Sequence, residues 1–133
     1  MPTINWLAVL AAAVSTFVLG GIWYSPALFY KAWQTESGVT DEQIKSSNMA
    51  KIFGLSFVFS LLMAANLAAF LSDPKIDMKM GTIYGFLTGF GWVALGMAII
   101  ALFERRSWKY MVINGGYMTV AFTIMGLIIG SWK

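Results

Sequence analysis

Four long stretches of the sequence contain no residue that is charged at neutral pH. They cover residues 4–30, 52–72, 80–103 and 110–132. A helix needs about 20 mainly apolar residues to cross the ~30 Å hydrocarbon core of a membrane. In that core the backbone must satisfy its own hydrogen bonds, so each stretch is predicted to be helical. The predicted fold is all-α: an integral membrane bundle of four transmembrane helices with short loops.

The composition favours a membrane over water as the surroundings of this chain. Of its 133 residues, 59% are hydrophobic and only 11% are charged, whereas soluble domains carry about 45–50% apolar and about 25% charged residues. A soluble chain of this size could not bury four such stretches. We therefore predict one transmembrane domain, residues 1–133, with spans at approximately 5–30, 52–72, 80–103 and 110–132.

The residue types that are missing exclude many kinds of chemistry. The chain has no Cys and no His, so it has no thiolate nucleophile, imidazole base or histidine metal site. No Asp, Glu, Lys or Arg lies within a span, and such groups usually mark proton relays and ion pathways. We expect no enzyme activity, no cofactor and no metal. The net charge of +3 lies at the ends of the spans, which argues against a nucleic-acid partner.

The distribution of basic residues predicts the orientation in the membrane. No Lys or Arg precedes the first span, which favours an N-terminus outside. Four spans place both termini on one face, together with the turn 73–79. The basic residues of that face are Lys75, Lys79 and Lys133, and those of the opposite face are Lys31, Lys45, Lys51, Arg105, Arg106 and Lys109. By the positive-inside rule, the second set lies in the cytoplasm and both termini lie outside.

Two local signals mark the loop after the first span. Ser25-Pro26 is expected to end the first helix, because proline lacks an N–H donor and disfavours helix at the preceding residue. Thr40-Asp41-Glu42-Gln43 has the pattern of a capping box, which predicts a short helix leading into the second span.

Small residues recur at a spacing of four in every span, which allows helix backbones to approach closely. The clearest case is the third span, where Gly81, Gly85 and Gly89 form a candidate helix-packing interface. Four helices can bury only part of four such stripes. We therefore expect a homo-oligomer, and we expect the glycines of the third span to form its subunit interface.

A few polar and aromatic residues within or beside the spans are candidates for function. Asn66 and Tyr84 lie toward the outer face, Trp92 lies near mid-span, and the inner face carries Trp23, Tyr24, Ser25, Pro26, Asn114 and Tyr117. An Asn in hydrocarbon needs a hydrogen-bond partner, so Asn66 and Asn114 are expected to bond across helices. Two interpretations stay open: these residues only join helices, or they line a small polar cavity for a neutral ligand or a lipid headgroup.

Some of these residues also carry a resemblance to a known family. Gly20-Gly21-Ile22-Trp23-Tyr24-Ser25-Pro26 and Asn114-Gly115-Gly116-Tyr117 resemble a family of small bacterial membrane proteins known only as domain of unknown function 1761. The resemblance covers essentially the whole chain. It implies a four-helix protein of the bacterial inner membrane with no established activity, and it supplies no catalytic residues.

Two functional hypotheses follow from the sequence. The first is a non-enzymatic, self-associating helical bundle with a structural or accessory role, whose partners are membrane lipids and further copies of itself. The alternative is a small oligomeric channel or permease for a neutral solute or lipid, lined by Asn66, Tyr84, Trp92 and Asn114.

Overall fold

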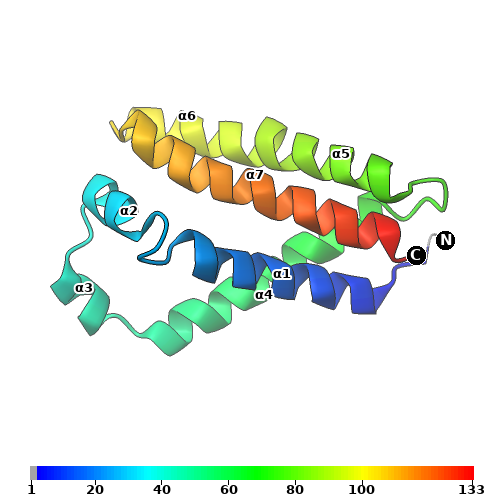
Figure 1. The fold of residues 1–133 in the computed structure, drawn as a ribbon, viewed down its shortest axis with the longest axis horizontal. Helices are drawn as coiled ribbons and strands as arrows, with labels where there is room; N and C mark the ends of the chain where they lie inside the picture. The colour runs from blue at the N-terminus through cyan, green and yellow to red at the C-terminus, as the bar shows by residue number, and fades with distance from the viewer. Residues whose placement is uncertain (1–2) are drawn as a thin grey trace.

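The computed structural model describes residues 3–133, so residues 1–2 of the predicted domain lie outside the described part. The described chain is all-helical and contains no strand. Its elements are α1 Trp6–Trp23, α2 Tyr30–Ser37, α3 Asp41–Ser46, α4 Met49–Phe70, α5 Met78–Thr88, the π-helix η1 Gly89–Ala94, α6 Leu95–Phe103 and α7 Trp108–Ser131. α5, η1 and α6 form one continuous rod (Figure 1).

Four helices are long and apolar enough to cross a membrane: α1, α4, the rod Met78–Phe103, and α7. The fold class is therefore the one the sequence predicts. The first span is shorter than predicted, because α1 ends at Trp23 and residues 24–29 form turns around Pro26 before α2 begins. α3 begins at the predicted capping box, in which the Thr40 side chain accepts from the Gln43 N–H and the Gln43 side chain accepts from the Thr40 N–H. Helix α2 was not predicted from the sequence.

The glycines of α5, together with Gly89 at the start of η1, pack against α7. A Cβ atom added to Gly81, Gly85 or Gly89 would lie under 3.0 Å from backbone or Cβ atoms of α7. Gly126 and Gly130 of α7 have the same relation to the backbone of α5 and its N-terminal cap. The two helices therefore touch backbone to backbone within one chain. This corrects the expectation that the α5 glycines form a subunit interface, since α7 already occupies that face.

The main core lies at the end of the bundle that carries both chain ends (Figure 1). There α1, α4 and α7 meet around apolar side chains such as Ala12, Ala64 and Met125, which are fully buried. At the opposite end α4 leaves the bundle and runs diagonally away from α7 (Figure 1). Each residue from Asn48 to Ser56 is exposed. α1, the loop helices α2 and α3, and Tyr117 of α7 border this half of α4.

Candidate functional site

The Trp-Tyr-Ser-Pro element joins the end of α1 to α7. The Trp23 indole Nε1 donates to the carbonyl oxygen of Ile113 over 2.9 Å, and the Tyr24 hydroxyl donates to Oδ1 of Asn114 over 2.5 Å. Asn114 therefore bonds across helices, as expected. Both partners are half-buried, and a buried polar group left without a partner is costly. These two bonds tie the C-terminal end of α1 to α7.

Tyr117 completes this cluster one turn further along α7. Its hydroxyl donates to the carbonyl oxygen of Thr16 over 2.9 Å, and its ring lies 5.4 Å from that of Tyr24 at an angle of 68°. Burial, with smaller contributions from Tyr117 and Tyr110, raises the pKa of the Tyr24 phenol above its ordinary value. The Tyr24 hydroxyl therefore keeps its proton and remains a donor.

Ser25 and Pro26 shape the turn and do not join the cluster. The Ser25 hydroxyl donates to the Ile22 carbonyl over 2.7 Å, and the Ser25 carbonyl accepts from the N–H groups of Leu28 and Tyr30. Pro26 is exposed. The role of this pair is to end α1 and to redirect the chain into α2.

Three of the predicted residues point away from the bundle. Asn66 is exposed on α4 and forms no side-chain hydrogen bond with residues 3–133, so the expectation that it bonds across helices is wrong. Tyr84 is 40% exposed and Trp92 is 82% exposed. Successive residues of an α-helix are about 100° apart. Since Ala64 and Ala68 face the core, Asn66 must face about the opposite way.

The four residues predicted to line a channel are thus not brought together. Only Asn114 lies at a contact between helices. The indole of Trp92 faces outward from η1, while α7 covers Gly89 on the other side.

A groove that sequence reasoning missed lies between α1 and the diverging half of α4. Its volume is about 760 Å³, and α2, α3 and Tyr117 of α7 complete its walls. Two glycines line part of it: a Cβ on Gly20 would lie 3.0 Å from the Tyr117 hydroxyl oxygen, and a Cβ on Gly21 would meet nothing within 4 Å. None of the residues that line the groove carries a charge. The adjacent pair Gly20-Gly21, beside the Trp-Tyr-Ser-Pro element, was the sequence signal that could have indicated it.

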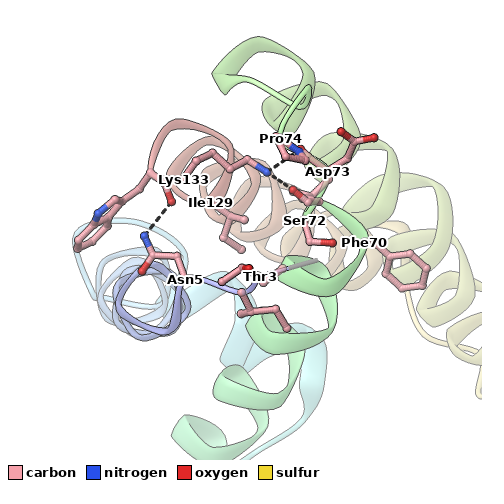
Figure 2. A pocket seen from close by; sticks show the side chains of 12 residues that line it. Thr3, Asn5, Phe70, Ser72, Asp73, Pro74, Ile129 and Lys133 are labelled. Carbon is pink, nitrogen blue, oxygen red and sulfur yellow. Dashed lines mark hydrogen bonds between the residues drawn. The ribbon is translucent and has the colours of Figure 1, made fainter. Parts of the chain in front are cut away.

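A second hollow, of about 860 Å³, lies at the other end of the bundle (Figure 2). There the Asn5 side chain donates to the Trp132 carbonyl over 3.0 Å. The Lys133 ammonium donates to the carbonyl oxygens of Leu71 and Asp73. Because Leu71 caps the C-terminus of α4, a cation beside its carbonyl is favourable. The Asn5 bond therefore joins the start of α1 to the C-terminal end of α7, and the Lys133 bonds join that end of α7 to the C-terminal end of α4.

The two loops at the diverging end of the bundle are also tied together. The Arg106 Nη1 donates to the Ser37 carbonyl over 3.1 Å, and the Ser107 hydroxyl donates to the Glu36 carboxylate. The Arg106 guanidinium lies 5.1 Å above the ring of Tyr110. These contacts hold α2 against the turn between α6 and α7 and so fix one wall of the groove. Among residues 3–133, no group of acidic, His or Cys side chains is arranged to hold a metal ion.

The chain has the features of a multi-pass helical membrane protein. These are four apolar helices, polar contacts where α1 meets α7, and charges confined to the loops and helix ends. The family comparison agrees with this class. The family model described as Protein of unknown function (DUF1761) matches residues 7–130, and the chain belongs to this family. The search of the curated proteins found no match, and neither did the search of the solved structures.

Proposed function

We propose that this protein is a non-enzymatic, self-associating component of the bacterial inner membrane, with both termini outside and a structural or accessory role. The side chain that best supports self-association is Trp92. The absence of His, of Cys and of charged residues within the spans supports a role without catalysis. The excess of Lys and Arg on the loops beside α2, α3 and the α6–α7 turn supports the orientation.

Trp92 lies near the middle of the third membrane-spanning helix. The rod Met78–Phe103 has 26 residues and is therefore about 39 Å long at about 1.5 Å per residue. Trp92 is about 2 Å from its midpoint on the same scale, and it is 82% exposed. Tryptophan normally settles at the membrane interfaces, where its ring meets both apolar and polar groups. A lipid-facing indole at mid-depth is thus unusual.

The indole N–H of Trp92 has no acceptor among residues 3–133, and hydrocarbon tails supply none. Leaving such a donor unpaired costs about 1–3 kcal/mol on the scale of protein mutational data. A carbonyl or hydroxyl oxygen of a second copy would remove this cost. The adjacent Gly91 has open space around its Cβ position, so the backbone of a second helix can approach the indole closely.

The alternative of a neutral-solute channel finds support only at such an interface. Asn66 and Tyr84 are exposed, so they could line a path between copies but not within one chain. Self-association is the more direct proposal, because both functions require it.

Oligomeric mass in lipid nanodiscs or mild detergent tests this proposal. We expect the wild-type protein to be a dimer or higher oligomer. Trp92→Phe keeps an aromatic ring but removes the N–H, and this variant should dissociate about tenfold more readily, which corresponds to about 1.4 kcal/mol. Phe70→Leu is the matched control, since Phe70 is 83% exposed at the end of α4. A wild-type monomer, or equal dissociation of Trp92→Phe and the wild-type protein, would contradict the proposal.

A further inference from the structure

We propose that the groove between α1 and the diverging half of α4 is a binding site for an uncharged, long-chain amphiphile that carries a hydroxyl group. This site is independent of self-association at Trp92, which lies on the rod α5–η1–α6 and does not line the groove. Three observations support the proposal: the dimensions of the groove, the absence of charge from its walls, and the state of its hydroxyl groups.

The dimensions suit one molecule with a long chain. A volume of about 760 Å³ lies within the range of roughly 300–1,000 Å³ found for small-molecule sites. Along α4 the lining extends from Met49 to Ser60, which is about 16 Å of helix and about half the thickness of the hydrocarbon core. The groove therefore runs from the loop helices α2 and α3 to mid-membrane.

The walls limit the charge of the occupant. Phe17, Phe53 and Ile52 supply apolar surface, and no Asp, Glu, Lys or Arg is among the lining residues. An ionised headgroup entering this groove would lose its hydration without gaining a counter-charge, which is strongly unfavourable. Charge complementarity therefore selects an uncharged molecule over a fatty acid or an anionic phospholipid.

The hydroxyl groups of the lining indicate what the occupant must offer. The Tyr24 and Tyr117 hydroxyls each give their single proton to a protein oxygen, Asn114 Oδ1 and the Thr16 carbonyl. The Ser60 hydroxyl likewise donates to the Ser56 carbonyl. Each of these oxygens is left with lone pairs that can accept a hydrogen bond. The lining also contains donors without an acceptor among residues 3–133, namely the Tyr30 and Ser56 hydroxyls and the Trp33 indole N–H. A ligand hydroxyl, which can both donate and accept, fits this mixed lining better than a ketone, an ester or an ether, which can only accept.

Photo-crosslinking of the full chain in nanodiscs tests the site directly. The probe is a long-chain fatty alcohol with a diazirine in its chain. The competitors are the unlabelled alcohol and the fatty acid of equal chain length. The pH is one at which the acid is ionised. We expect saturable labelling that maps to the segments 17–24 and 52–60. The alcohol should compete at least about tenfold better than the acid, which corresponds to about 1.4 kcal/mol.

Substitution of Gly21 by leucine adds a side chain to the lining of the groove, and nothing lies within 4 Å of the Cβ position from which it starts. Gly54→Leu is the matched control: Gly54 is an exposed glycine of α4 with equally open surroundings, and it does not line the groove. We expect Gly21→Leu to weaken saturable labelling at least about tenfold and Gly54→Leu to leave it unchanged, with similar thermal unfolding midpoints for both variants. Tyr117→Phe, which removes one acceptor oxygen, should reduce the preference for the alcohol over the matching alkane.

Several results would overturn the proposal. These are labelling that does not saturate, labelling of Gly21→Leu equal to that of Gly54→Leu, and competition by the ionised acid that equals competition by the alcohol. Crosslinks between protein chains through Gly21, obtained with a diazirine amino acid at that position, would show that a second copy fills the groove instead.

Discussion

The contact between α5 and α7 offers the sharpest test of how this bundle is held together. Replacing Gly85 by alanine adds one methyl group, and that Cβ would lie under 3.0 Å from the carbonyl oxygen of Phe122. Helix backbones are the groups that clash, so a change of rotamer cannot relieve the strain. The helices must move apart, and they then lose dispersion contacts along the whole glycine stripe.

The expected loss of stability can be compared with known overpacking. Extra methylene groups forced into a packed core cost about 1–3 kcal/mol. Here the obstacle is backbone on both helices, which places Gly85→Ala at the upper end of this range, about 3 kcal/mol. In an exposed helix position the same substitution is expected to stabilise by about 0.8–1.0 kcal/mol, because alanine has the higher helix propensity.

Gly54→Ala and Gly96→Ala provide that reference, since both glycines are helical and have nothing within 4 Å of their Cβ positions. The measurement is the free energy of unfolding of each variant in the same detergent or lipid nanodisc. Gly85→Ala should unfold at least about 3 kcal/mol more easily than either control. If Gly85→Ala is as stable as Gly54→Ala, the backbone contact between α5 and α7 does not hold the bundle together.

Two further substitutions test local features in the same assay. Asn114→Leu leaves the Tyr24 hydroxyl without its acceptor and should lower the free energy of unfolding by about 1–3 kcal/mol. The double variant with Tyr24→Phe should be less destabilised, because no donor is left unpaired. A double variant at least as unstable as the single one would contradict this. Arg105 has φ 61°, and the N–H groups of Arg105 and Arg106 bond back to Leu102 and Ala101, which is the Schellman pattern that favours glycine at this position. Arg105→Gly should therefore stabilise the folded protein by up to about 1 kcal/mol. Arg105→Ala removes the same charge but should not stabilise it. Equal effects of the two substitutions would refute backbone strain at Arg105.

The fold could be predicted from sequence because the membrane imposes one strong constraint. A segment without charges that is long enough to cross the hydrocarbon must be helical, whatever its neighbours. Local signals also sufficed where the chemistry is local, as at the capping box of Thr40 and Gln43. The bond between Tyr24 and Asn114 was harder to foresee, since the sequence indicated only that Asn114 needed some partner.

The rotation of each helix about its own axis was not predictable in this way. Asn66 and Asn114 look equivalent in sequence, yet one is exposed and the other bonds across helices. Their difference depends on which stripe of small residues on each helix packs against a neighbouring helix. The groove has the same origin: it exists because the part of α4 that precedes Ser60 lies away from the bundle, and no local pattern in α4 specifies that departure.

The π-helix η1 shows how the rotation of one helix about its axis determines which side chains the protein exposes. A regular spacing of four from Gly81, Gly85 and Gly89 would next bring Val93 against α7, where its branched side chain would separate the helices. The π-turn adds one residue, so that Ala94 is buried while Val93 is only partly buried, and the buried Ala101 follows two turns later. A Cβ on Gly115 of α7 would lie 3.3 Å from the Cβ of Ala94, so the close approach continues beyond the glycine stripe. The same extra residue turns Trp92 toward the lipid and leaves Gly96 uncovered. Tight packing of the rod on α7 and the exposed mid-membrane indole therefore have a single structural cause.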